Sequence, residues 1–252
     1  MFLHADREGA GPPIVLVHGF TQTRRCWGPE AVTLAADHEV IRVDAPGHGG
    51  SATIMAGLRT GGRLIADQGG QATYLGYSMG ARFCLHLALS NPELVKGLVL
   101  ISGTAGIEDP GERAERRAQD LRTAARIEQD GLGPFLDAWL AQPLFSRLPP
   151  ARAFRTERLE NTVEGLQSSL EQAGTGSQDP SWHRLHRLAM PVLLVAGADD
   201  PKFAALAERM VVEIGANATL GLVEGAGHAA HLEQPDRFLA LLQPWLAQVD
   251  PG

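Results

Sequence analysis

The sequence contains few cysteines and few lysines. Its two cysteines, Cys26 and Cys84, do not make a disulfide framework in a chain of 252 residues. We therefore expect reduced thiols and a cytoplasmic location. Only Lys96 and Lys202 are lysines, so nearly all of the 22 basic residues are arginines. Because arginine binds carboxylates through two parallel hydrogen bonds, any arginine that faces a cavity is a candidate for anion binding.

Long apolar runs and a cationic N-terminal segment are also absent. The first eight residues are of mixed polarity, so we expect neither a signal peptide nor a transmembrane helix. The formal net charge of −7 argues against nucleic acid or an anionic membrane as the main partner. There is no G-x-G-x-x-G or Walker loop, and we expect no nucleotide cofactor. The His228-x-x-His231 spacing is not accompanied by His-Glu-x-x-His or a cysteine cluster, so we expect no metal.

Short apolar runs separated by helix-length segments indicate an α/β fold with a mostly parallel sheet covered by helices on both faces. The expected strands are 13–17, 39–43, 72–75, 97–101, 192–195 and a weaker 218–223, which precedes a helix over 236–249. The chain length suits one domain with an insertion. Three helix-like segments, 112–130, 133–141 and 151–173, interrupt the alternation. We predict a core formed by 1–104 and 187–252, and a helical cap formed by 105–186.

The pentapeptide Gly76-Tyr77-Ser78-Met79-Gly80 lies between a predicted strand and a predicted helix. In a G-x-S-x-G sequence at this position, a tight turn holds the serine hydroxyl above the edge of the sheet. Glycines flank the serine because side chains there would clash across the turn. The pentapeptide is short, and its position between strand and helix is what indicates a nucleophile elbow.

A serine hydroxyl becomes a nucleophile or a base when a histidine takes its proton and a carboxylate orients that histidine. In folds with this elbow, the chain order is Ser, then Asp or Glu, then His. Ser78, Asp200 and His228 satisfy the order, and each follows an apolar run. Asp199 is the alternative acid. We prefer Asp200 because it directly precedes Pro201, just beyond the strand.

Two other histidines compete with His228. His18 follows the first long strand in a His-Gly turn, which is typical of an oxyanion hole or simply of a tight turn. His231 begins the approach to the last helix, where we expect a supporting role. The backbone N–H groups of Phe20 and Met79 are the predicted donors of the oxyanion hole.

Over essentially its whole length, the chain resembles the α/β-hydrolase superfamily. Within that superfamily it resembles the 2-succinyl-6-hydroxy-2,4-cyclohexadiene-1-carboxylate synthases of menaquinone biosynthesis. The resemblance rests on the elbow followed by Ala81-Arg82, and on the segments 98–104, 112–120, 139–145, 174–176, 200–203 and 226–231. Two features depart from the pattern. Position 81 is alanine where many relatives have a second glycine, and the glycine-rich segment 51–62 lacks a clear helix.

The resemblance implies a lyase that uses no cofactor. Its triad abstracts a ring proton from a substrate bearing three carboxylates, and a 2,5-elimination then expels pyruvate. By position, the resemblance makes Ser78 the base and Arg82 a ligand of a substrate carboxylate. It assigns Arg116 and Trp139 to the substrate pocket, with Arg158 as a further candidate. A small polycarboxylate in a partly dry pocket needs fixed cations, which these arginines would supply.

Structural alternatives exist for several of these residues. Arg116 lies among acidic residues on one predicted helix, which is typical of an exposed, salt-bridged face. Trp139 could belong to the interior of the cap, and Tyr77 could contribute to the pocket or only to packing. The same triad also fits a serine hydrolase in which Ser78 attacks an ester, a thioester or a carbon–carbon bond. A non-catalytic binding protein on the same scaffold is the third hypothesis.

Overall fold

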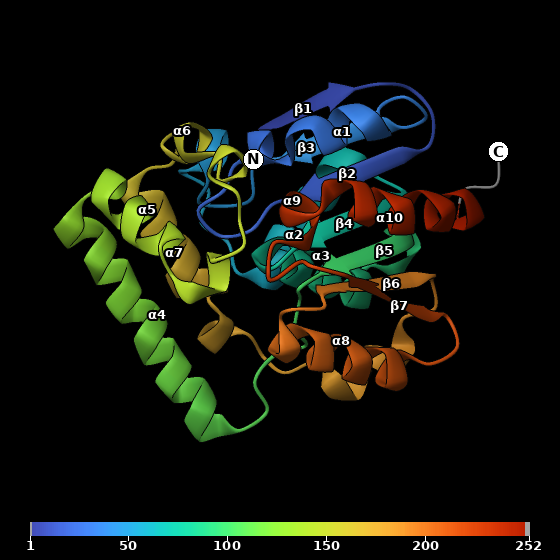
Figure 1. The fold of residues 1–252 in the computed structure, drawn as a ribbon. Coiled ribbons are helices and arrows are strands. Elements are labelled where there is room, and N and C mark those ends of the chain that lie inside the picture. Colours follow the sequence, from blue (N-terminus) through green and yellow to red (C-terminus); the bar gives the residue numbers. More distant parts are fainter. Residues whose placement is uncertain (1, 250–252) are drawn as a thin grey trace.

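A seven-stranded sheet forms the centre of the computed structural model, which describes residues 2–249 (Figure 1). The strand order is β1-β3-β2-β4-β5-β6-β7, with β1 antiparallel to β3 and the other neighbouring strands parallel. β4 and β6 are buried over their whole length, as expected for apolar strands between two helical layers. The mostly parallel sheet predicted from the sequence is confirmed. The strands are β1 (Ala5–Glu8), β2 (Pro13–Val17), β3 (Glu39–Val43), β4 (Ala72–Tyr77), β5 (Val95–Ile101), β6 (Val192–Gly197) and β7 (Ala218–Val223).

Helices cover both faces of the sheet. Apolar side chains of α2 (Leu58–Gly69), α3 (Met79–Ser90) and α8 (Pro201–Ile214) share one core cluster with the strands. Those of α1 (Gly28–Leu34), α9 (Ala230–Glu233) and α10 (Pro235–Val249) form the second cluster on the other face. No helix within residues 2–249 combines the length and the apolar character needed to cross a lipid bilayer.

Four helices lie beside the sheet, to the left of the strands in Figure 1. They are α4 (Pro110–Asp130), α5 (Leu132–Leu140), α6 (Arg155–Arg158) and α7 (Val163–Ala173), and the described chain between β5 and β6 contains no strand. The apolar side chains of α4, α5 and α7 form a third, separate cluster: Ala124, Ile127, Phe135, Leu136, Leu166 and Leu170. We call the four helices between β5 and β6 the cap. The bounds 105–186 remain a prediction, since Trp182 and Leu185 pack in a core cluster.

The sequence predicted one helix over 151–173, and this prediction is wrong. The segment contains a 3-10 turn, the short α6 and then α7. Phe154 has a left-handed backbone (φ 51°), which a continuous right-handed helix does not allow. Thr162 starts α7 anew, because its side-chain oxygen accepts the N–H of Gly165 at 3.0 Å. The 3-10 helices of the chain are η1 (Arg24–Trp27), η2 (Gly49–Ser51), η3 (Pro92–Leu94), η4 (Pro143–Phe145), η5 (Pro150–Arg152), η6 (Thr175–Ser177) and η7 (Trp182–Arg187).

The glycine-rich segment 51–62 also differs from expectation, because α2 begins at Leu58. The glycines serve helix packing there. A Cβ at position 61 would overlap the ring of Phe83 on α3, and one at position 62 would lie 3.0 Å from the carbonyl oxygen of the same residue. Glycine therefore lets α2 and α3 approach closely, although glycine lowers helix propensity.

Candidate active site

Ser78 lies at the turn between β4 and α3, with an unusual backbone conformation (φ 51°, ψ −104°). Its N–H donates a 2.8 Å hydrogen bond to the carbonyl oxygen of Ile101 at the end of β5. A Cβ at position 76 would overlap the backbone of Gly80, and one at position 80 would overlap the carbonyl oxygen of Val17. The two glycines therefore let strand, turn and helix pack closely enough to hold the serine in this conformation.

Three side chains from separate loops meet at this turn. His228 Nε2 lies 3.2 Å from Ser78 Oγ, and His228 Nδ1 lies 3.1 Å from Asp200 Oδ2. His228 and Asp200 are buried, whereas Ser78 is half-buried. The carbonyl oxygen of His228 accepts a 2.8 Å hydrogen bond from Ser102 Oγ, which fixes the loop that carries the imidazole. The arrangement can pass a proton from the serine to the imidazole, with the carboxylate orienting the ring.

The carboxylate of Asp200 has opposing influences on its pKa. Burial raises the pKa, but hydrogen bonds from His228 and from the N–H of Phe203, together with nearby positive charge, bring it below its ordinary value. Asp200 is therefore ionised at neutral pH. An ionised Asp200 favours the tautomer of His228 with its proton on Nδ1, and Nε2 is then free to accept the serine proton.

The alternative acid, Asp199, lies elsewhere. Its side chain is exposed and forms an ion pair with Arg147 at 3.0 Å. Asp200, not Asp199, contacts His228.

The two rival histidines are buried and make different contacts from His228. His18 Nε2 accepts the N–H of Ala45 at 3.0 Å, and its Nδ1 lies 2.8 Å from the carbonyl oxygen of Gly19. His231 packs against aromatic rings, among them Trp27 at a centroid distance of 4.9 Å. Burial lowers the pKa of His18 to about 4 and that of His231 to about 3, so both are neutral at pH 7. Neither contacts Ser78.

The predicted oxyanion donors have free backbone N–H groups. Among the described residues, no hydrogen-bond acceptor contacts the N–H of Phe20 or of Met79. Met79 is the first residue of α3, where an N–H has no partner within the helix. Phe20 follows Gly19, whose N–H donates to Gln22 Oε1 at 2.9 Å, so the turn is fixed by one of its own side chains.

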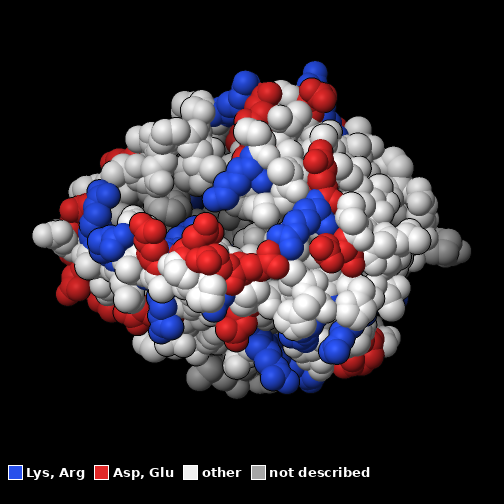
Figure 2. Space-filling view, turned by 90° about the horizontal axis from the view of Figure 1, so that it is seen from below, with Lys and Arg blue, Asp and Glu red and all other residues white. Residues whose placement is uncertain are grey.

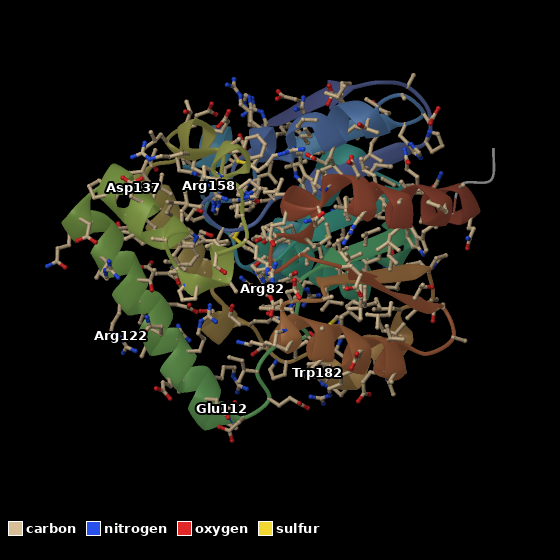
Figure 3. The ribbon with its side chains drawn as sticks, in the orientation of Figure 1. Arg82, Glu112, Arg122, Asp137, Arg158 and Trp182 are labelled. Atoms are coloured by element: carbon tan, nitrogen blue, oxygen red, sulfur yellow. The ribbon has the colours of Figure 1, made fainter. Side chains whose placement is uncertain are left out.

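Arg82 and Arg158 are buried arginines that point toward the junction of core and cap (Figure 3). Arg82, one helical turn after the elbow serine, donates Nη1 to the carbonyl oxygen of Ala173 at 2.6 Å. Arg158 donates to the carbonyl oxygen of Ala153 at 2.7 Å and to Thr21 Oγ1. Neither guanidinium forms an ion pair with a carboxylate in the described part of the chain. Because buried charges are ordinarily paired, these two groups suit an anionic ligand.

Arg116 differs from these two arginines. Its side chain is 40% exposed, and its Nε donates to Asp120 Oδ1 at 2.8 Å. The other oxygen of Asp120 accepts the N–H of Gly176 at 2.9 Å. Burial and the positive charge of Arg116 together lower the pKa of Arg82 to about 10, while Asp120 opposes the change. Arg82 therefore remains charged at pH 7, with the Arg116–Asp120 pair close by.

Two aromatic residues from the predicted set line the same region. The ring of Trp139 lies 5.2 Å from that of Phe20, and its indole Nε1 is buried without a hydrogen-bond partner among the described residues. Tyr77 is buried between His228 and His231, with centroid distances of 5.5 and 4.5 Å. Burial raises the pKa of Tyr77, so its hydroxyl stays protonated. Tyr77 thus packs behind the imidazole, and Trp139 covers the loop that carries the Phe20 N–H.

The molecular surface is hollowed between the cap and the core, with basic and acidic side chains along the edge of the hollow (Figure 2). Within the described part of the chain, no three His, Cys, Asp or Glu side chains are grouped in a way that could hold a metal ion. The site therefore combines a serine, an imidazole, a carboxylate and two guanidinium groups without carboxylate partners in residues 2–249.

A model of the alpha/beta hydrolase family matches residues 14–241. The chain belongs to the alpha/beta hydrolase family. Two similar proteins carry the name 2-succinyl-6-hydroxy-2,4-cyclohexadiene-1-carboxylate synthase, which is given provisionally to the first. The first, from Bacillus subtilis (strain 168), is 34% identical and covers 97% of this chain and 93% of its own. The second, from Salmonella schwarzengrund (strain CVM19633), is 32% identical and covers 93% of this chain and 95% of its own.

Solved structures of other alpha/beta hydrolases are similar over nearly the whole chain. MenH from S. aureus has a TM-score of 0.90 at 28% identity, covering 98% of both chains. A thermophilic esterase from Thermogutta terrifontis, in its malate-bound structure, has a TM-score of 0.84 at 25% identity. It covers 98% of this chain and 93% of its own.

Three residues that were not predicted as site residues shape the site of this alpha/beta hydrolase. Gln22 fixes the turn before the triad loops, Asp120 holds Arg116, and Asn161 bonds to the backbone of Thr21. Asn161 is a buried polar residue in a segment that the sequence pattern assigned to a continuous helix. The role of Asn161 can therefore be recognised only from its contacts in the folded structure.

Proposed function

We propose that this protein is a 2-succinyl-6-hydroxy-2,4-cyclohexadiene-1-carboxylate synthase of menaquinone biosynthesis. It would eliminate pyruvate from 2-succinyl-5-enolpyruvyl-6-hydroxy-3-cyclohexene-1-carboxylate. The observation that carries the proposal is the pair of buried arginines without carboxylate partners, Arg82 and Arg158, on the side of the core that bears Ser78 and His228. The names and the coverage of the Bacillus and Salmonella relatives support the same reaction.

In the proposed reaction, Ser78 removes a proton from the substrate ring while His228 takes the proton of the serine hydroxyl. The electron pair of the broken C–H bond forms a new ring double bond, and the existing ring double bond shifts toward the carbon that carries the enolpyruvyl group. The ring C–O bond to the enolpyruvyl group breaks in the same 2,5-elimination, and pyruvate leaves as its enolate, which takes up a proton. Asp200 stabilises the imidazolium that forms on His228, at a distance of 3.1 Å.

Charge developing on a substrate oxygen needs donors that are already in place. The free N–H groups of Phe20 and Met79 would supply them, in a site from which protein side chains exclude part of the water. Arg82 and Arg158 would bind substrate carboxylates through charge-assisted hydrogen bonds. Arg116 would contribute a further positive charge from the cap, held by Asp120. Trp139 and Tyr77 would form walls of the pocket.

A serine hydrolase with a covalent acyl-enzyme is the alternative, because the same three side chains serve both reactions. The similarity to the Thermogutta esterase supports this hydrolase alternative. The two unpaired buried arginines favour the polycarboxylate lyase, since an ester with an apolar acyl chain leaves both charges unpaired. The contacts among Ser78, His228 and Asp200 argue against a purely non-catalytic binding protein.

A cytoplasmic location is part of the proposal. Both cysteines are free and buried, Cys26 and Cys84. Reduced thiols are usual in the cytoplasm.

The decisive experiment offers the purified protein the enolpyruvyl precursor and follows pyruvate release with a coupled lactate dehydrogenase assay. A panel of p-nitrophenyl esters is tested in parallel. The proposal expects rapid pyruvate release and slow ester hydrolysis. Rapid hydrolysis of neutral esters without pyruvate release would support the hydrolase instead, and no turnover in either assay would support a binding protein.

A further inference from the structure

Thr21 has a left-handed backbone, with φ 67°, and it is completely buried. A positive φ is uncommon for residues other than glycine, and for a β-branched residue it is a true outlier. Such a conformation is strained and persists only where surrounding contacts enforce it. Thr21 directly follows Phe20, the predicted oxyanion donor. Whatever holds Thr21 therefore also sets the backbone of the oxyanion turn.

Two cap residues hold Thr21 through its carbonyl oxygen and its hydroxyl. Asn161 donates Nδ2 to the carbonyl oxygen of Thr21 at 2.7 Å, and Arg158 donates Nη1 to Thr21 Oγ1. The same Nδ2 also donates to the carbonyl oxygen of Arg158 at 2.9 Å. Asn161 thereby joins the carbonyl at the end of α6 to the oxyanion turn.

The remaining polar atom of Asn161 is also used. Its Oδ1 accepts the N–H of Gly49 at 3.0 Å, in the loop that follows β3. Asn161 is only 5% exposed, so all of these bonds lie away from bulk water, where leaving one unmade is costly. One amide thus connects a cap segment to two loops at the carboxyl ends of the core strands.

We propose that Asn161 is a positioning residue that keeps Thr21 left-handed and so holds the Phe20 N–H in the oxyanion geometry. The inference rests on the proposed function of the oxyanion turn, and it holds whether the enzyme is a lyase or a hydrolase. It makes assembly of the oxyanion hole depend on the docked cap. Because its side-chain amide bonds to Thr21, Arg158 and Gly49, Asn161 would act through these groups and not by contacting substrate.

The test compares Asn161→Ala and Asn161→Asp with the wild type, using whichever substrate the enzyme turns over. We expect kcat to fall roughly 10- to 100-fold in both, less than the ~10²- to 10³-fold loss for a deleted oxyanion donor. KM should change less than about threefold, because Asn161 bonds to the carbonyl oxygen of Arg158 and not to the guanidinium that would bind a substrate carboxylate. Aspartate keeps the acceptor for Gly49 but loses the donor to Thr21. A wild-type kcat in Asn161→Asp would overturn the inference.

The matched control is Asn217→Ala. Asn217 also donates Nδ2 to two carbonyl oxygens, those of Leu188 and Met190 at 2.7 and 2.6 Å, but it lies on the turn before β7. Its loss should lower the melting temperature without lowering kcat. An equal fall in kcat in Asn217→Ala and Asn161→Ala would mean that both act only through stability.

A second background tests the route through Thr21. Glycine adopts a positive φ without strain, so Thr21→Gly reduces the need for the clamp. We expect Asn161→Ala to lower kcat by a smaller factor in the Thr21→Gly background than in the wild type. The same factor in both backgrounds contradicts the inference. Ser78→Ala tests the proposed function separately. Activity retained in Ser78→Ala would contradict the triad, and an oxyanion role could then no longer explain a fall in kcat in Asn161→Ala.

Discussion

Hydrogen-bond partners distinguish His228 from the other buried histidines of the chain. His18 bonds to backbone groups of its own and a neighbouring loop, and His231 packs among aromatic rings. His228 alone among these three joins a hydroxyl to a carboxylate. Burial by itself therefore does not identify a catalytic histidine. A catalytic histidine is identified instead by a hydrogen-bond acceptor at one ring nitrogen and a hydroxyl at the other.

Replacing Ser78 or His228 by alanine should abolish most of the activity. We expect kcat/KM to fall by about 10³-fold or more in each single variant, and a similar fall in the double variant, because the two groups act as one unit. Steady-state kinetics of pyruvate release gives the measurement, with circular dichroism to check folding. His183→Ala, at an exposed histidine of η7, is the control and should keep full activity. Near-normal activity in Ser78→Ala would remove the triad assignment.

Replacing Arg82 by methionine should weaken substrate binding more than it slows the chemical step. Methionine keeps the apolar stem but loses a charge-assisted hydrogen bond, which contributes roughly 1.5–3 kcal/mol. We expect KM to rise about 10- to 100-fold for the polycarboxylate, and much less for a neutral ester. Arg126→Met is the control, because Arg126 is exposed and pairs with Asp130 at 3.3 Å. An equal rise in KM on charged and neutral substrates contradicts the role of Arg82.

At the scale of elements, the sequence predicted what depends on apolar periodicity and missed what depends on packing partners. The strands buried on both faces, such as β4 and β6, are continuous apolar runs and were predicted. β1 was not predicted, because it is an edge strand whose residues are mostly half-buried and polar. α2 was missed because its glycines, which serve close packing on α3, also resemble loop composition.

The residues of the candidate site were likewise predictable only where a local sequence pattern identifies them. Ser78, Asp200 and His228 were predicted because an elbow motif and a fixed chain order identify them, and the structure places them in contact. Asn161 and Thr21 could not be predicted, since a left-handed threonine held by a distant amide has no local sequence signal. Contacts between residues 140 positions apart follow only from the folded cap.

The packing of α3 against β2 makes Gly80 irreplaceable. A Cβ at this position would overlap the carbonyl oxygen of Val17, which is backbone and cannot move aside. We expect Gly80→Ala to lower the free energy of unfolding by several kcal/mol, about 3 or more, or to prevent folding. Urea unfolding provides the measurement.

The control is Gly133→Ala in α5, where the nearest atom to a new Cβ is a flexible Arg155 nitrogen at 3.8 Å. Alanine favours a helix over glycine, so this variant should be neutral or more stable by about 0.5–1 kcal/mol. Destabilisation of both variants to the same extent would show that the close approach of α3 to β2 is not the cause.

For the whole molecule, charge is distributed unevenly between surface and interior. The chain has a net charge of −7, yet two of its arginines are buried without carboxylate partners at the junction of core and cap. Acidic and basic side chains alternate over the face seen in Figure 2. Because buried charges interact in a lower dielectric than surface charges, each of the two arginines acts more strongly at this junction than a surface charge does, despite the negative total. The proposed polycarboxylate substrate is therefore compatible with an acidic protein.

The same burial makes the folded protein sensitive to acid. Burial lowers the pKa of His18 and His86 to about 4 and of His48 and His231 to about 3, against about 6.5 when unfolded. Below pH 6.5 the unfolded chain binds protons that the folded chain does not, so stability falls with pH until each folded pKa is reached. Each group contributes a slope of up to about 1.4 kcal/mol per pH unit in that window.

His231→Phe isolates one of these groups, because phenylalanine suits the aromatic surroundings of His231 and does not titrate. Urea unfolding at pH 7, 5.5 and 4.5 should show a shallower loss of stability in His231→Phe than in the wild type, by about 1 kcal/mol per pH unit below pH 6. Glu30, whose pKa is raised by burial, acts in the opposite direction near its own pKa, but it is common to both proteins and cancels in the comparison. His183→Gln, at an exposed position, should follow the wild type. Parallel curves for His231→Phe and the wild type from pH 7 to 4.5 would mean that the pKa of His231 is the same in the folded and the unfolded protein, because only a group with an unshifted pKa adds no slope.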